Sequence, residues 1–148
     1  MKFYIKKYND LTLDNLYDLI SLRQSVFVVE QNCPYEDVDQ KDKICFHLLG
    51  YKNKELIAYS RIFPPDSLHK ESVSIGRIVV LKSYRKKGIG VGLINESLNF
   101  VESNFGKINI RIEAQSYLKE FYSKFGFKII SDEYLEDGIP HQKMILKL

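Results

Sequence analysis

The 148-residue chain lacks tryptophan and contains only 2 cysteines and 4 prolines. The two cysteines, Cys33 and Cys45, form neither a close metal-binding pair nor a disulfide framework, which favours a reducing compartment. No apolar run approaches the roughly 18 residues that a membrane-spanning helix needs. The N-terminal stretch also lacks the pattern of a secretory signal peptide. We therefore expect a cytoplasmic protein without a membrane partner.

An excess of charge of one sign is also missing. The net charge is only +3 at neutral pH, and the cationic residues are spread along the sequence. Nucleic-acid-binding surfaces concentrate basic residues on one face or along one helix, so we expect no nucleic-acid partner. The apolar share of 45% and the charged share of 28% are ordinary for a globular protein, and with this length they predict a single domain over residues 1–148.

A basic turn with two glycines separates an expected strand from an expected helix. Residues 73–81 form an apolar, β-branched run, and the helix after the turn has apolar residues at the spacing of one helix face: Val91, Ile94, Leu98, Val101 and Phe105. The turn consists of Arg85, Lys86, Lys87, Gly88, Ile89 and Gly90. Glycine lets a backbone approach a ligand closely, and the first turn of a helix presents unpaired N–H groups that attract anions. The pattern predicts a phosphate-binding turn.

Two familiar phosphate-binding motifs do not fit this turn. A P-loop requires Lys-Ser or Lys-Thr after its second glycine, whereas Gly90 is followed by valine and glycine. A dinucleotide-binding fingerprint requires the spacing G-x-G-x-x-G, which Gly88, Gly90 and Gly92 do not have. Residues 85–90 instead resemble the R/Q-x-x-G-x-G/A turn with which the GNAT superfamily of N-acyltransferases binds the pyrophosphate of acyl-CoA.

A second segment, residues 115–127, resembles the N-x-x-A-x-x-x-Y-x-x-x-G-F segment of the same superfamily. Tyr122 occupies the position of the tyrosine that faces the CoA sulfur. Gln115 stands in place of the usual asparagine and Leu118 in place of the usual alanine. The resemblance implies that Gln115 binds the pantetheine arm. The alternative is that Tyr122 is simply a core aromatic residue on a short helix.

Further motifs resemble the ElaA-like branch of the superfamily and extend over nearly the whole chain. They are VFVVEQNCP at residues 26–34, IGR at 75–77, AQ at 114–115 and EDGIPH at 136–141. This resemblance implies acetyl-CoA as the donor, no metal, and a small-molecule or protein amine as the acceptor. It also implies backbone contacts to the donor at Ile78, Val79 and Val80. A homodimer and a monomer both stay open.

Acyl transfer from a thioester to an amine requires a group that protonates the leaving thiolate and a group that deprotonates the amine. A tyrosine is protonated at neutral pH, so Tyr122 is the expected general acid. The two expected bases are Glu30, which follows an apolar run, and His141, which has the appropriate intrinsic pKa. Further candidates are Asp39, Glu113 and His47. The acidic residues Glu36, Asp37, Asp39 and Asp42 are expected to form a solvated loop or to attract a cationic acceptor.

The predicted order of elements is β-α-(α)-β-β-β-α-β-α-β-β. It indicates an α/β (mixed α+β) fold with a central, mostly antiparallel mixed sheet of about six to seven strands flanked by helices, as in GNAT acyl-CoA N-acyltransferases. Two other functions stay open. The chain either binds acyl-CoA as a catalytically silent regulatory module, or uses its basic turn to bind a nucleotide or RNA.

Overall fold

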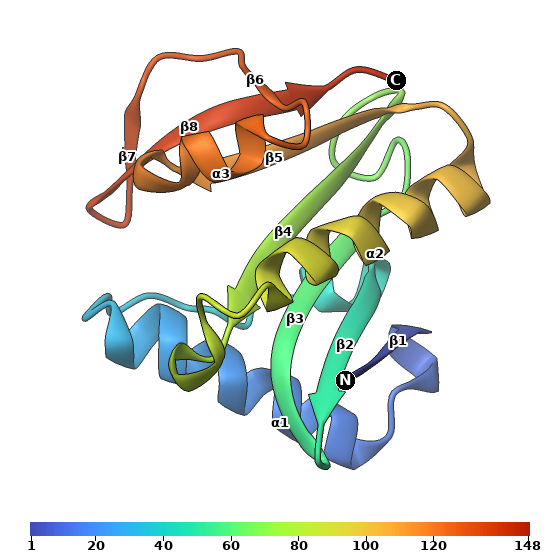
Figure 1. Ribbon diagram of the computed structural model, residues 1–148, viewed down its shortest axis with the longest axis vertical. Coiled ribbons are helices and arrows are strands. Elements are labelled where there is room, and N and C mark those ends of the chain that lie inside the picture. The colour runs from blue at the N-terminus through green and yellow to red at the C-terminus, as the bar shows by residue number, and fades with distance from the viewer.

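The computed structural model describes residues 1–148, whose eight strands form one sheet in the order β1-β2-β3-β4-β5-β8-β6, with β7 paired to β8 (Figure 1). The strands are β1 (Lys2–Lys7), β2 (Phe46–Lys52), β3 (Glu55–Phe63), β4 (Ser72–Val80), β5 (Asn109–Gln115), β6 (Lys128–Ile129), β7 (Tyr134–Glu136) and β8 (Ile139–Leu146). Only the β4–β5 pair is parallel. The predicted mixed, mostly antiparallel sheet is confirmed, and β7 is an additional short strand.

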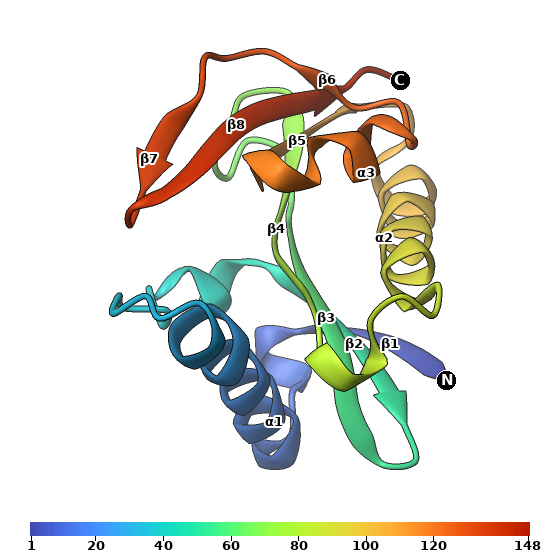
Figure 2. The same cartoon turned by 60° about the vertical axis from the view of Figure 1, so that its left-hand side comes forward.

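The two central strands, β4 and β5, separate along their length. They are paired only from Ser72 to Ser74 on β4, after which they diverge (Figures 1 and 2). On its other side, β4 contains a bulge in which Arg77 and Ile78 together face Ser60 of β3. A bulge bends its strand and leaves a backbone group without a ladder partner. Because the pairing with β5 ends at Ser74, the edge of β4 that faces β5 is open beyond that residue.

Three α-helices accompany the sheet: α1 (Leu13–Arg23), α2 (Ile89–Phe105) and α3 (Lys119–Ser123). Helix α1 begins at a capping box in which Thr12 and Asn15 satisfy each other's backbone N–H groups, and it continues as a π-helical turn over Gln24–Glu30. Helix α2 ends at Gly106, whose φ of +74° is readily adopted only by glycine. No helix of the chain combines the length and the apolar character needed to cross a bilayer.

Helices α1 and α2 cover opposite faces of the sheet (Figure 2). Leu19, Leu22 and Val26 from α1 and the π-helical turn pack against Tyr59 and Val79. On the other face, α2 and the C-terminal part of the chain contribute to a core of Ile62, Val73, Ile94, Val101, Ile110, Tyr122, Phe127 and Met144. These opposed layers hold β4 from both sides where its edge toward β5 is open.

The structure differs from the expected elements in three places. Val91, expected on the buried helix face, is 45% exposed because it lies in the first turn of α2, beside the glycine turn. The composition of residues 28–43 predicts a turn-rich segment, but its first three residues belong to the π-helical turn, and it ends in a 3₁₀ turn over Lys41–Ile44. The sequence pattern predicts the last strand over residues 142–147, whereas β8 begins at Ile139 because it pairs with the unpredicted β7.

Candidate active site

The glycine turn before α2 has the geometry of an anion-binding site. Gly88 is the N-cap of α2 with φ +79°, and no side chain caps the helix. The first backbone bond of the helix runs from the Gly92 N–H to the Gly88 carbonyl at 3.1 Å, so the preceding N–H groups of the first turn have no helical partner. There is no acidic residue in that turn. Residues 88–90 therefore present free N–H groups and the positive end of a 17-residue helix.

The cations of this turn do not all point at the same place. Arg85 was expected to add charge to a phosphate site. Its two terminal guanidinium nitrogens instead donate to the two carboxylate oxygens of Glu30 at 2.7 and 3.0 Å. Lys87 donates to the Ser83 carbonyl oxygen at 3.2 Å. Lys86 adopts φ +62° within the turn, where its backbone helps to reverse the chain. The anion-binding character of the turn thus depends chiefly on its backbone and on the lysine charges.

The open edge of β4 leads directly to this turn. The Leu81 N–H donates to the Ile57 carbonyl at 2.8 Å, so the backbone groups of Leu81 and Val79 face β3. By the alternation of an antiparallel ladder, the N–H and C=O of Val80 point the other way, toward the missing partner. The Arg85 Nε donates to the Val80 carbonyl at 2.9 Å. The Val80 N–H is left without a strand partner, beside the glycine turn.

Tyr122 lies on α3, next to the start of α2. The ring of its neighbour Phe121 is 5.2 Å from the Tyr122 ring, centroid to centroid, and a Cβ added at Gly90 would lie 3.5 Å from Phe121. Tyr122 itself is 5% exposed. Burial, and to a smaller extent Tyr117, raises the pKa of Tyr122 above its ordinary value, so the phenol stays protonated at neutral pH. Tyr122 is thus a core aromatic residue, as in the simpler alternative, with a protonated hydroxyl and with its neighbour Phe121 beside the glycine turn.

Gln115 and His141 lie opposite each other on β5 and β8. The Gln115 amide exchanges hydrogen bonds with the Gln31 amide, with N···O distances of 3.2 and 3.5 Å. The Cys33 sulfur lies 3.5 Å from the backbone carbonyl oxygen of Asp137. These contacts join the segment after the π-helical turn to β5 and to the β7–β8 turn, an arrangement that the sequence did not predict.

His141 is held at one ring nitrogen. Its Nδ1 lies 2.7 Å from the Ile139 carbonyl oxygen, and because a carbonyl oxygen only accepts, Nδ1 carries the hydrogen. In the neutral ring the lone pair is then on Nε2, which lies 3.6 Å from a Glu136 carboxylate oxygen. The ring also stacks on Tyr134 with a centroid distance of 6.0 Å. Among the remaining base candidates is Glu113, which lies two residues before Gln115 on β5 and opposite Lys143 of β8.

Three of the four acidic residues that were expected to lie in a solvated loop turn inward and are buried or partly buried. These residues, Asp37, Asp39 and Asp42, bind three arginines that come from α1, β3 and β4. Asp37 and Asp42 are 7% and 6% exposed, and Arg23 is completely buried. The arginines hold the pKa of Asp39 and Asp42 well below the usual range despite burial, which by itself would raise it. The expectation of a solvated loop was wrong for these three aspartates, because each has a guanidinium partner that is distant in sequence, whereas Glu36 is exposed as expected.

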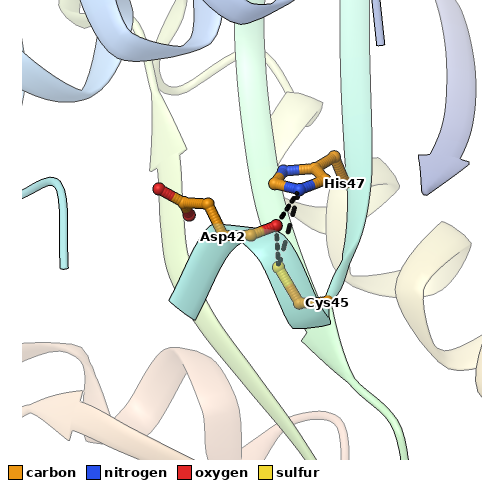
Figure 3. Close-up of side chains that lie close together, drawn as sticks. All are labelled: Asp42, Cys45 and His47. Atoms are coloured by element: carbon orange, nitrogen blue, oxygen red, sulfur yellow. Dashed lines mark hydrogen bonds between the residues drawn. The ribbon is translucent and has the colours of Figure 1, made fainter. Parts of the chain in front are cut away.

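Asp42, Cys45 and His47 bring three potential metal-ligand atoms within 4.8 Å of one another (Figure 3). Hydrogen bonds already occupy these atoms, because His47 Nε2 donates to the Asp42 carbonyl at 2.8 Å and His47 Nδ1 lies 2.7 Å from the Tyr59 hydroxyl. The Asp42 carboxylate binds Arg23 and Arg61, while burial raises the pKa of the Cys45 thiol to about 12.

A cation would therefore have to displace two guanidinium groups and ionise a thiol whose proton is strongly held. The cluster fits a structural role, which is to hold the 3₁₀ turn Lys41–Ile44 against β2. His47, one of the candidate bases, is committed to this role.

Comparisons with known proteins agree with this geometry. The family model described as an acetyltransferase (GNAT) domain matches residues 19–148. The protein ElaA of Escherichia coli (strain K12) is 41% identical over 136 residues, which cover 90% of this chain and 88% of ElaA. The crystal structure of E. coli ElaA has a TM-score of 0.92 at 38% identity, with 99% of each chain covered.

The crystal structure of an acyl-CoA N-acyltransferase from Pseudomonas aeruginosa has a TM-score of 0.93 at 37% identity, again over 99% of each chain. The resemblance indicated by the glycine turn and the EDGIPH motif is thus confirmed. The chain belongs to the GNAT family of acyl-CoA-dependent acyltransferases, in its ElaA-like branch.

Proposed function

We propose that this protein transfers an acetyl group from acetyl-CoA to a primary amine by direct attack of the amine on the thioester. The observation that carries the proposal is that a glycine turn with free N–H groups follows the open edge of β4, and that Phe121, the neighbour of the protonated Tyr122, lies beside Gly90 of this turn. No covalent enzyme intermediate is needed. This agrees with the cysteines, since Cys45 is buried and its thiol proton is strongly held.

The donor would be held mainly by backbone groups. The free N–H groups of residues 88–90 and the charges of Lys86 and Lys87 would bind the pyrophosphate. The pantetheine arm would follow the open edge of β4 beside Ile78 and Val80, with the Gln115 amide next to it. The backbone groups of Val79, which were also expected to contact the donor, face β3 instead. The side chain of Val79 would not contact the donor, because it packs into the core against α1.

The proposed reaction transfers two protons, one from the amine to a base and one from an acid to the leaving thiolate. The amine nitrogen forms a bond to the thioester carbon, the carbon–sulfur bond breaks, and the Tyr122 hydroxyl protonates the thiolate. His141 Nε2 accepts the proton of the amine, because Nδ1 is held on the Ile139 carbonyl and the Nε2 lone pair is free in the neutral ring. Glu136, 3.6 Å away, would stabilise the imidazolium that forms.

Glu30, the other expected base, is less suited to that task. Both of its oxygens already accept hydrogen bonds from Arg85, so an amine would have to displace the guanidinium group to reach them. We assign it the task of holding Arg85 over the end of β4, where Arg85 also binds the Val80 carbonyl.

The test is release of CoA thiol from acetyl-CoA in the presence of a panel of primary amines that includes polyamines, amino acids and short peptides. We expect amine-dependent release, with Tyr122→Phe reducing turnover at least about tenfold at an unchanged acetyl-CoA dissociation constant, since general-acid catalysis contributes at least that much. Tyr117→Phe, a change at the exposed neighbouring tyrosine, is the matched control and should retain full turnover.

A silent acyl-CoA-binding module is the alternative. It predicts tight acetyl-CoA binding with no amine-dependent thiol release from any member of the panel. A nucleotide- or RNA-binding protein predicts instead that oligonucleotides bind and that this binding weakens steeply with salt.

A further inference from the structure

The backbone of β4 is strained at one point in the active-site strand. Arg77 has φ +50°, a left-handed conformation that non-glycine residues seldom adopt, and it is the only non-glycine residue with positive φ inside a strand of this protein. It forms the bulge with Ile78, opposite Ser60. Strain of this kind persists only where surrounding contacts enforce it.

The contacts that enforce it come from the acidic segment. The Arg77 Nε donates to Asp37 Oδ1 at 2.8 Å, and a second guanidinium nitrogen lies 3.2 Å from the Asp37 backbone carbonyl. The same guanidinium lies 3.5 Å from Asp39 and 5.5 Å from the centroid of the Tyr35 ring. The side chain of the strained residue is thus held on several sides by the segment from residue 35 to 39.

The acidic segment is itself anchored to the core. The other carboxylate oxygen of Asp37 accepts from the Nε of the fully buried Arg23 at 2.8 Å. Asp42 bridges Arg23 and Arg61 at 2.8 and 3.0 Å, and Asp39 accepts two bonds from Arg61 at 2.8 and 2.7 Å. Three carboxylates and three guanidinium groups balance in charge. They connect α1, β3 and β4 through a single loop.

We propose that Arg77 and Asp37 are positioning residues for the thioester carbonyl of the donor. This inference rests on the proposed function. The bulge interrupts the β3–β4 ladder at Arg77 and Ile78, and it directly precedes the stretch of β4 in which the Val80 N–H has no strand partner. A backbone N–H that stabilises a developing oxyanion must be held within tenths of an ångström of its place, and here the Asp37–Arg77 pair supplies that restraint.

The test separates the side-chain anchor from the backbone conformation. Glycine adopts positive φ without strain, so Arg77→Gly leaves the bulge accessible and removes only its anchor. We expect kcat to fall at least tenfold, while the acetyl-CoA dissociation constant measured by calorimetry changes less than threefold. Arg77→Lys, which keeps the charge but loses the forked geometry, should recover part of kcat. Asp37→Asn should lower kcat in the same direction.

Lys54→Gly is the matched control. Lys54 also has positive φ, +66°, but it lies in the β2–β3 turn, so both kcat and binding should be unchanged. Should Arg77→Gly fail to fold, Arg77→Lys provides the same comparison of kcat with binding. The inference is overturned if the folded variants keep wild-type kcat, or if binding weakens as much as kcat falls. A wild-type protein without amine-dependent turnover would contradict the proposed function itself, which is a separate result.

Discussion

The glycine turn and the arginine–aspartate network meet along β4, yet they are built in opposite ways. The turn is made of six consecutive residues, and its proposed function depends on backbone N–H groups at the start of one helix. The network is made of side chains from α1, β3, β4 and a loop, and its pairs Arg23–Asp37 and Arg77–Asp37 span 14 and 40 residues of sequence. One region is local and exposed, whereas the other is long-range and buried.

Because the two regions are built differently, we expect substitutions in them to have different effects. Binding at a local backbone site should be more sensitive to the conformation of one or two glycines than to the loss of any single charged side chain. A buried charge network should control stability and alignment and be insensitive to changes on the surface. The predictions below test each half of this contrast, from the largest expected effect to the smallest.

Replacing Gly88 by valine should abolish most acetyl-CoA binding. The left-handed φ of +79° is strained for a β-branched residue, so the turn must rearrange and its N–H groups lose their alignment. Loss of two hydrogen bonds to a charged phosphate corresponds to a loss in affinity of about 100-fold or more. Isothermal titration calorimetry measures the change.

Gly106→Val is the control for that variant. Gly106 has φ +74° at the opposite end of the same helix, and a Cβ at either glycine meets no atom within 4 Å. Gly106→Val should lose at least as much stability as Gly88→Val, because the ψ of −157° at Gly106 belongs to a region that is essentially restricted to glycine, but only Gly88→Val should lose binding. Equal losses of binding would show that α2 as a whole, and not its glycine turn, holds the donor.

Replacing His141 by glutamine should reduce turnover roughly 100-fold, the lower end of what a general base contributes. The affinity for acetyl-CoA should be unchanged, because the donor is assigned to β4 and His141 lies on β8, with β5 and its Gln115 between the two strands. Steady-state rates with the best amine of the panel measure the effect. His69→Gln is the matched control, and a variant of His141 that keeps wild-type turnover would remove it from the mechanism.

The buried network predicts a pH dependence of stability. Burial lowers the pKa of His47 below its unfolded value of about 6.5, so the folded state keeps the neutral ring while the unfolded state takes up a proton as the pH falls. The free energy of unfolding should therefore be highest above pH 6.5 and decrease below it, by at most about 1.4 kcal/mol per pH unit.

Asp39 and Asp42 act in the same direction only at lower pH. Arginine partners lower the pKa of both, so their contribution is present above the unfolded value of about 3.9 and is lost below it. Urea unfolding between pH 5 and 7 should then report mainly His47, and His47→Gln should flatten the dependence. An unchanged slope in that variant would contradict the assignment.

Replacing Glu30 by glutamine should have the smallest effect. Glu30 is partly exposed at the surface, and such ion pairs contribute up to about 1 kcal/mol, so turnover and acetyl-CoA affinity should each change less than about fivefold. Glu55→Gln, which removes another carboxylate that accepts a side-chain hydrogen bond, is the control. A 100-fold loss of turnover at unchanged affinity would instead identify Glu30 as the base.

The sequence predicted the parts of the fold that local pattern determines. Helix α2, the glycine turn and the strand before it follow from periodicity and from the positions of the glycines. Strand β7 was not predicted, because three residues carry no periodicity and are held only by pairing with β8. The resemblance to GNAT proteins was needed to single out Tyr122 and Gln115, which periodicity alone would place among ordinary core and strand residues.

The network could not be predicted from the sequence for a physical reason. A buried carboxylate and an exposed one look alike in sequence, and only the fold shows whether a guanidinium lies within reach of Asp37 or Asp42. The pairing of Glu30 with Arg85 across 55 residues is of the same kind. The positive φ of Arg77 had no sequence signal either, since it is enforced by contacts with Asp37.

The most direct test of the central claim is a calorimetric titration of the protein with acetyl-CoA, run beside dephospho-CoA and ATP. The account predicts saturable binding of acetyl-CoA at micromolar concentration. Dephospho-CoA should retain most of that affinity, because it keeps the pyrophosphate and the pantetheine arm, and ATP should bind far more weakly. A folded sample that does not bind acetyl-CoA, or that binds ATP equally well, would contradict the assignment of the glycine turn and the open edge of β4 to the donor.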